Sequence, residues 1–227
     1  MSTIMNMAAF SIPISYTSLG DPSRELNKLL VADALYETEL NHASARSGVN
    51  VIQTMFGMET KYTSFEQLTH LIKQFVEPYL KWVGVTSTFV EIHDLWANVN
   101  TSPYAYHMPH SHSTRNNDIF TGVYFPTSGF QDGVAVSEKQ DISSPVVSSK
   151  TMPGPGDLVF LDPLENIKTS IATTTTQKYP FFGNPICIEP REGTIVLFPS
   201  YLSHLVTPTK KENFTRISIA YNVRVSA

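Results

Sequence analysis

The sequence predicts a mainly β protein of the α+β class, in which an antiparallel double sheet, a jelly roll or barrel, carries a cover of N-terminal helices. Two observations predict this class. From about residue 86 onward, short strand-like runs follow one another with turn signals between them and no helical pattern. Before that point, apolar residues recur at helical spacing in two segments. We expect one domain over residues 1–227, with a helical cover at about 20–83 and a β core at about 86–225.

The composition narrows the classes of function. A formal net charge of −4 without a basic cluster argues against nucleic acid as a partner. The single cysteine, Cys187, permits no intrachain disulfide and indicates a reducing compartment. No apolar run reaches the roughly 18 residues of a membrane span, and the N-terminus lacks the basic and apolar regions of a signal peptide. We therefore expect a cytoplasmic protein that does not contact a membrane.

The first strand and the first helix are predicted near the N-terminus. Residues 10–16 favour an edge strand, because Pro13 cannot donate to a ladder. Asp21 and Pro22 favour a helix start, and the helix is expected to run to about residue 41. Its apolar stripe is Leu26, Leu29, Leu30, Ala34 and Leu35. Residues 42–63 fit no regular pattern.

A second helix is predicted to begin at Ser64, which with Gln67 fits a capping box. Pro78 should kink or stop this helix, although the apolar face could continue beyond it. The expected buried face is Leu68, Leu71, Ile72, Phe75 and Val76. Both helices are best explained as cover for a sheet.

The strand-like part of the chain is divided by turn signals. Strand patterns occupy residues 86–100, 120–125, 133–138, 157–162, 184–190, 193–200 and 214–225. Gly-rich and Pro-rich turns at 132–133, 153–156 and 192–193 separate several of them. Residues 165–183 include a threonine tract and are expected to form an insertion or a flexible lid.

Three of the seven histidines, His107, His110 and His112, fall within six residues. Residues at i and i+2 of an extended segment project from one face, so His110 and His112 can reach one metal ion together. His204, after a strand pattern, can supply a third ligand. A histidine-rich surface loop is the alternative, but the apolar strand that follows the cluster favours an anchored site. The other histidines, His42, His70 and His93, are interpreted as structural or solvated.

Arg216 lies in a strand that is otherwise largely apolar. Because a buried unpaired charge is very costly, this arginine must point outward or meet an anion. Ser218 shares its strand face, so both side chains can meet the same carboxylate. The planar guanidinium suits such a ligand, since it can form two parallel hydrogen bonds with a carboxylate.

These residues carry a family resemblance. H-x-H, TGVYF, LVFLDP, EGTIVLFPSYLSH and RISIAYN resemble segments of 2-oxoglutarate/Fe(II)-dependent oxygenases found in marine bacteria and their phages. The similarity covers nearly the whole chain and is strongest from Trp96 to Asn222. It implies a double-stranded β-helix of the jelly-roll or cupin-like kind, in the host cytoplasm if the protein is phage-encoded. It also implies Fe(II) on His110, His112 and His204, with O2 as a cosubstrate.

The resemblance further implies that Arg216 and Ser218 bind the distal carboxylate of 2-oxoglutarate. Thr121, in the strand beyond the histidine pair, could add a hydroxyl contact to this cosubstrate. Asn98 and Trp96 share one face of an earlier strand; Asn98 could line the pocket, whereas Trp96 is better explained as core.

One position departs from the wider superfamily. Most such enzymes bind iron with two histidines and one carboxylate, but His112 stands where Asp or Glu is usual. Asp118, six residues further on, does not fit the i, i+2 geometry. Three neutral imidazoles leave more positive charge on the site and select less clearly against zinc, copper or nickel. The roles of His107 and Asp118 stay open.

The sequence thus favours a dioxygenase that decarboxylates 2-oxoglutarate to succinate and hydroxylates a small molecule or a protein or peptide side chain. Two alternatives remain. A zinc hydrolase of the metallo-β-lactamase type also begins with H-x-H, but the aspartate–histidine pair of that motif is missing after His112. A non-catalytic cupin-like module, or a phage structural protein, would leave Arg216 beside Ser218 unexplained. The helices and edge strands are compatible with a homodimer.

Overall fold

The computed structural model describes residues 11–20, 23–45, 47–87, 89–101, 103–112, 118–131, 134–135, 147–149, 153–164, 185–209 and 212–226. The segment predicted as an insertion or lid, residues 165–183, lies outside this part of the chain, as do the proposed helix start at Asp21 and the turn at 132–133.

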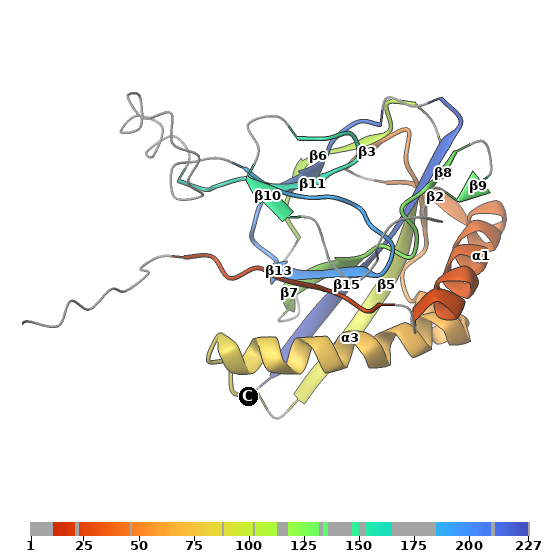
Figure 1. Ribbon diagram of the computed structural model, residues 1–227. Helices are drawn as coiled ribbons and strands as arrows, with labels where there is room; N and C mark the ends of the chain where they lie inside the picture. Colours follow the sequence, from red (N-terminus) through yellow and green to blue (C-terminus); the bar gives the residue numbers. More distant parts are fainter. Residues whose placement is uncertain are drawn as a thin grey trace, which may run out of the picture.

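Two antiparallel sheets form the body of the described structure (Figure 1). The nine-stranded sheet runs β1-β13-β7-β15-β5-β4-β2, with β8 on β15 and β9 on β8. Its strands are β1 (Ser15–Ser18), β2 (His42–Ser44), β4 (Ile52–Thr54), β5 (Phe89–Asn100), β7 (Asp118–Tyr124), β8 (Phe130–Gln131), β9 (Val134–Ala135), β13 (Thr194–Pro199) and β15 (Phe214–Ser226). The six-stranded sheet runs β10-β12-β11-β14-β6-β3. Its strands are β3 (Gly48–Val49), β6 (Tyr106–His110), β10 (Val147–Ser149), β11 (Leu158–Phe160), β12 (Ile186–Ile188) and β14 (His204–Val206).

Alternation along β13 and β15 places the two hydrophobic cores on opposite faces of the nine-stranded sheet. Ile195 and Leu197 belong to the core under the helices, whereas Val196 and Phe198 belong to the core between the sheets. On β15 the apolar residues that pack toward the helices are Ile217, Ile219, Tyr221 and Val223. The intervening residues of β15, which begin with Arg216, therefore face the space between the sheets.

Helices α1 (Arg24–Leu40) and α3 (Thr63–Trp82) cover the outer face of the nine-stranded sheet, as the sequence predicts (Figure 1). The predicted stripe of α1 is partly wrong, because Leu29 and Leu35 are exposed. Asn27 and Glu37 are buried in their place, since each has polar partners there. Asn27 accepts the Tyr124 hydroxyl, and Glu37 accepts the Tyr62 hydroxyl and the Lys61 ammonium group.

Local structure in the N-terminal half departs from the sequence reading at several points. Ser64 does not cap α3, because Tyr62 is the N-cap and the Ser64 hydroxyl donates to Asp33. Pro78 does not end α3, which continues to Trp82 with Tyr79 and Leu80 buried, the continuation of the apolar face that the sequence left open. Residues 42–63, which fit no pattern, form β2, β3, β4 and the short helix α2 (Met58–Lys61). The first strand begins at Ser15, later than predicted, although it does lie at a sheet edge.

Among the described residues, none of the helices combines the length and the continuous apolar character that a membrane span requires.

Gly122 is expected to be essential for the close packing of β7 between β13 and β15. A Cβ at this position would overlap the Tyr221 ring and the Val196 carbonyl oxygen. Tyr221 is fully buried and donates to that same carbonyl at 2.8 Å, so neither group can move away. We expect Gly122→Ala to lower the free energy of unfolding by about 3 kcal/mol, as measured by urea denaturation.

Gly84→Ala is the control for this variant. Gly84 has a φ of 76° and open space around it, so this change should cost only about 1 kcal/mol of backbone strain. Equal losses in the two variants would contradict the packing argument.

Candidate metal and cosubstrate site

The structure brings together the three histidines that the sequence singles out. His110 ends β6 and lies directly across from His204 on β14, in the six-stranded sheet. His112 follows two residues later, and its backbone N–H donates to Ser200 at 2.8 Å. One nitrogen from each of the three rings lies within 4.8 Å of the others, a grouping that can hold a metal ion.

The hydrogen bonds of the three rings leave one nitrogen of each available. His110 Nδ1 lies 2.8 Å from the Met108 carbonyl, and His204 Nδ1 lies 3.0 Å from the Leu202 carbonyl. A carbonyl oxygen only accepts, so each Nδ1 carries the proton and each Nε2 keeps its lone pair. His112 Nδ1 lies 3.3 Å from the Thr121 hydroxyl. All three imidazoles are therefore arranged to offer Nε2, as histidines in metal sites usually are.

Burial favours the neutral, metal-binding form of these rings. Desolvation lowers the pKa of His112 to about 4 and that of His204 to about 3. Burial also lowers the pKa of His110. Near pH 7 all three rings are thus neutral, and a metal ion need not displace protons from them.

Arg216, on the neighbouring sheet, is the largest fully buried side chain of the described residues. Its Nε and Nη1 groups have no hydrogen-bond partner in that part of the chain. Burial lowers the pKa of Arg216 to about 10, while the negative charge of nearby Asp157 acts in the opposite direction and raises it. The guanidinium therefore stays positive near pH 7. The Phe125 ring lies 5.1 Å from the guanidinium carbon. A buried cation with free donors is what an anion-binding site requires.

A cavity of about 550 Å³ connects the three histidines with Arg216. Ser218 lines it on the strand face of Arg216, and Asn98 lies opposite Ser218 in the pairing of β15 with β5. The Asn98 Oδ1 atom is buried without a partner among the described residues. Both Ser218 and Asn98 line this cavity. Trp96 is buried, as expected for core, and also lines the cavity with its ring 5.7 Å from that of His112.

Thr121 lies beside the cavity and not among the residues that line it. Its hydroxyl donates to the Tyr221 carbonyl at 2.9 Å and lies 3.3 Å from both His112 Nδ1 and Asn222 Oδ1. In this arrangement Thr121 fixes the orientation of the His112 ring.

The far end of the cavity carries charged groups. Asp94 and Asp118 line it, and His93 lies between them, 3.1 Å from one carboxylate and 2.8 Å from the other. Asp118 also lies 3.5 Å from Arg224. Asp118 is therefore held in its own network and does not join the three-histidine cluster, as its sequence spacing suggests.

Sequence reasoning missed several residues around the cavity. Asn222 shares the strand face of Arg216 at an even spacing, so the period of two could have found it. Ser47, Gln53 and Phe56 also line the cavity but come from the segment without a regular pattern. Nothing in their spacing connects them with the histidines.

Together, the two sheets define a double-stranded β-helix protein, and its cavity is lined by three imidazoles that could hold a metal ion and by a buried guanidinium. Residues 94–222 match the family described as "Putative 2OG-Fe(II) oxygenase", and the chain belongs to this family. It is accordingly an oxidoreductase of the dioxygenase type that uses Fe(II) and 2-oxoglutarate. Among curated proteins, no relative matches the chain.

Solved structures share the fold at low sequence identity. A prolyl-4-hydroxylase from Pseudomonas putida aligns with a TM-score of 0.58 and 14% identity, covering 95% of this chain and 94% of that one. The epimerase SnoN from nogalamycin biosynthesis, in complex with Fe3+, alpha ketoglutarate and nogalamycin RO, has a TM-score of 0.59, 8% identity, and coverage of 94% and 79%. The viral collagen prolyl hydroxylase of Paramecium Bursaria Chlorella virus-1, as its 2OG complex, has a TM-score of 0.53, 12% identity, and coverage of 94% and 96%. These likenesses confirm the predicted double-stranded β-helix.

Proposed function

We propose that the chain is a hydroxylase in which His110, His112 and His204 hold Fe(II), while Arg216 and Ser218 bind the distal carboxylate of 2-oxoglutarate. One observation carries this assignment. Three rings, of which that of His204 is buried, each offer a nitrogen within 4.8 Å of the others, and a buried arginine with two N–H groups that lack partners among the described residues lines the same cavity. A non-catalytic module has no need for that combination.

Each residue has a defined task in this proposal. The hydrogen bonds at Nδ1 hold the three rings in the tautomer that leaves Nε2 free for the metal. Arg216 supplies N–H donors for the cosubstrate anion. Because its guanidinium is already protonated near pH 7, it can bind the anion without taking up a proton. Trp96 and Phe125 pack beside the metal and anion groups and limit the entry of water. When bound, Fe(II) and 2-oxoglutarate supply the oxidising chemistry, in which O2 is consumed and 2-oxoglutarate is converted to succinate and CO2.

The absence of a carboxylate ligand has consequences for charge. Three neutral imidazoles leave a divalent ion with its full charge of +2, which favours a dianionic cosubstrate but selects less clearly for iron. Zinc would occupy the same nitrogens without redox chemistry. Iron-dependent turnover is therefore the property that distinguishes a hydroxylase from a zinc enzyme.

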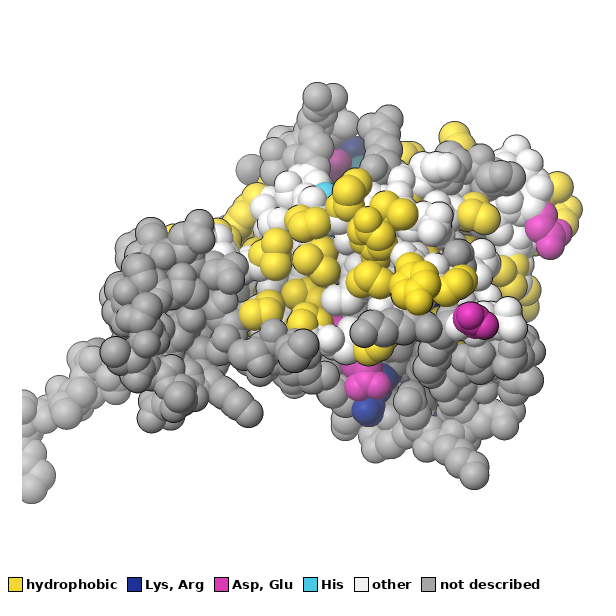
Figure 2. Space-filling model, turned by 90° about the horizontal axis from the view of Figure 1, so that it is seen from above, with side chains coloured by type: hydrophobic (Ala, Val, Ile, Leu, Met, Phe, Trp, Pro, Cys, Tyr) yellow, Lys and Arg dark blue, Asp and Glu magenta, His cyan; other side chains and the backbone are white. Residues whose placement is uncertain are grey.

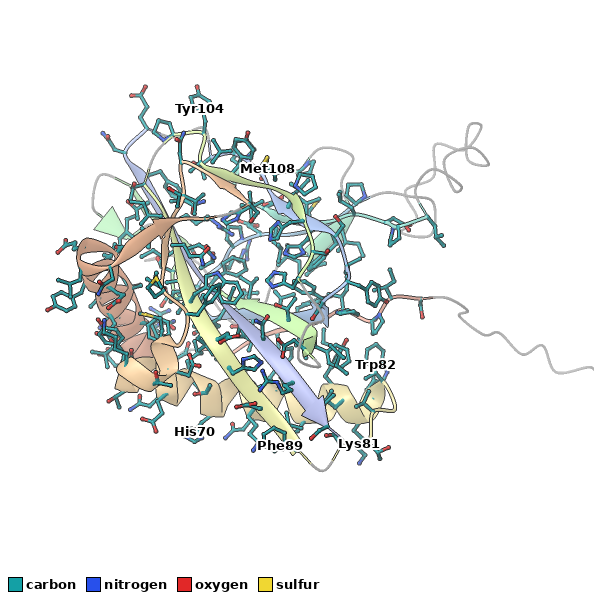
Figure 3. The ribbon with its side chains drawn as sticks, turned by 180° about the vertical axis from the view of Figure 1, so that it is seen from behind. His70, Lys81, Trp82, Phe89, Tyr104 and Met108 are labelled. Atoms are coloured by element: carbon teal, nitrogen blue, oxygen red, sulfur yellow. The ribbon has the colours of Figure 1, made fainter. Side chains whose placement is uncertain are left out.

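The prime substrate is proposed to be a small molecule or a protein or peptide side chain. The cavity reaches the surface between exposed Met55 and Phe56, which both line it. Hydrophobic side chains also gather on the face beside the six-stranded sheet (Figure 2). Tyr104 and Met108 project on this side of the molecule and are exposed (Figure 3). An apolar surface of this kind can hold the chain that flanks a target side chain.

Succinate release tests the proposed function. With Fe(II), ascorbate and O2, we expect the protein to convert 2-oxoglutarate to succinate faster than Fe(II) alone, even without a prime substrate. The zinc-loaded protein is the matched control and should release none. Equal succinate release with and without protein, together with failure of the metal-loaded protein to bind 2-oxoglutarate, would refute the proposal.

A further inference from the structure

A fourth imidazole, that of His107, faces the same cavity and has no role in the proposed function. His107 lies on β6, is 6% exposed and lines the cavity together with Arg216. It is not part of the three-histidine cluster, whose ligand atoms are those of His110, His112 and His204. A buried histidine in an active-site cavity needs a partner for its second nitrogen.

Ser47 holds the His107 ring in place. The Ser47 hydroxyl lies 3.2 Å from Nδ1, and the Ser47 carbonyl accepts the backbone N–H of Met108 at 2.8 Å. The turn before β3 is thus attached to β6 at two points, the His107 ring and the backbone N–H of the next residue, Met108. In the described part of the chain, Nδ1 has this one partner and Nε2 has none.

The surroundings of His107 favour a neutral ring. The ring is buried and shares the cavity with the guanidinium of Arg216, where a second positive charge would be costly. A neutral ring carries a single N–H group. If the Ser47 hydroxyl donates to Nδ1, that N–H is on Nε2 and is available to a ligand in the cavity.

Arg216 indicates what that ligand would be. Its Nε and Nη1 groups also lack partners among the described residues, and it lines the same cavity as His107. An anion between the two side chains would accept hydrogen bonds from both. A neutral N–H beside a guanidinium satisfies a carboxylate without placing a second buried positive charge next to the first.

We propose that His107 donates a hydrogen bond from Nε2 to the 2-oxoglutarate carboxylate that Arg216 binds, and that Ser47 positions the ring for this contact. This inference rests on the proposed function, since it concerns the same cosubstrate. It assigns His107 to cosubstrate binding and not to the metal.

The test is calorimetric titration of 2-oxoglutarate into Mn(II)-loaded protein without O2, which measures binding apart from turnover. His107→Phe keeps a ring but removes its nitrogens, and we expect it to raise the 2-oxoglutarate Kd by about tenfold or more. His107→Gln restores a side-chain N–H donor and should bring the Kd back to within about threefold of wild type. Mn(II) affinity should stay within about twofold in both variants, because the three metal ligands are intact.

Two further variants complete the set. Ser47→Ala removes the group that orients the ring and should weaken 2-oxoglutarate binding in the same direction as His107→Phe, but less. His70→Phe makes the same substitution on the exposed surface of α3 and should leave both affinities unchanged (Figure 3). If thermal melting shows that His107→Phe does not fold, the 2-oxoglutarate Kd values of His107→Gln and Ser47→Ala are used to test the role of His107.

The outcomes separate this inference from the proposed function. An unchanged 2-oxoglutarate Kd in His107→Phe, or in Ser47→Ala where the former does not fold, overturns the role of His107. A loss of Mn(II) affinity in His107→Phe also overturns it, because His107 would then be a metal ligand. If wild-type protein loaded with Mn(II) binds no 2-oxoglutarate, the proposed function itself fails.

Discussion

Replacing Arg216 with alanine is expected to abolish 2-oxoglutarate binding at working concentrations while leaving the metal in place. Hydrogen bonds to charged groups are worth about 1.5–3 kcal/mol each, so losing two of them should raise the Kd by at least about 100-fold. Titration of 2-oxoglutarate into Mn(II)-loaded protein measures the effect. Because Arg216→Ala also removes the positive charge near buried Asp157, thermal melting should accompany the titration to show that the variant is folded.

Arg224→Ala is the matched control for this result. Arg224 lies eight residues further along β15 and makes an ion pair with Glu91 at 2.8 Å. Its loss should leave the 2-oxoglutarate Kd unchanged. Arg216→Lys keeps the charge but not the planar fork, so it should recover only part of the affinity. Wild-type affinity in Arg216→Ala would show that the carboxylate binds elsewhere.

Replacing His204 with alanine is expected to cost metal affinity more than any substitution outside the cluster. Loss of an outer-shell partner of a metal ligand costs roughly 10–100-fold, and loss of the ligand itself should exceed about 100-fold. His204 is buried beside Phe160 and Phe198, with its ring 4.9 Å from that of Phe198. The other residues of β14, Leu205 and Val206, have no atom that could bind the metal in its place. Competition titration with Mn(II) or Co(II) measures the affinity.

The control for His204 comes from the second group of residues that could hold an ion, His93, Asp94 and Asp118. These residues are already paired with one another and with Arg224, which disfavours a cation there. His93→Ala should therefore keep the wild-type metal stoichiometry. A protein that loses its metal in His93→Ala and retains it in His204→Ala would place the ion at the wrong end of the cavity for this account.

Much of the site could be predicted because it lies on strands with a strict period of two. Arg216 and Ser218 share a face of β15 for that reason. His110 ends β6, and His112 lies two residues beyond it, at the i, i+2 spacing from which the pair was predicted. His204 could be proposed because it follows a strand pattern that ends at Pro199. The fold class could be predicted because many short strand patterns follow one another without helical patterns between them.

The rest depends on tertiary partners that spacing does not show. Leu29 and Leu35 have the spacing of a buried stripe but are exposed. Asn27 and Glu37 are buried instead, because Asn27 accepts a hydrogen bond from Tyr124 and Glu37 accepts one from Lys61. Ser64 had the sequence of a cap, but Asp33 on α1 accepts its hydroxyl. Thr121 was predicted from its strand position to contact the cosubstrate, and that contact stays a prediction. In the structure its hydroxyl lies 3.3 Å from Nδ1 of His112. The contact between the Ser47 hydroxyl and the His107 ring could not be predicted, because Ser47 lies in a segment without any periodic pattern.

The most direct measurement is a crystal structure of the protein with Mn(II) and 2-oxoglutarate, obtained without O2. The account predicts one ion bound by Nε2 of His110, His112 and His204, and the distal carboxylate of 2-oxoglutarate on Arg216. An ion held by His93, Asp94 and Asp118, or an Arg216 side chain without an anion beside it, would contradict it.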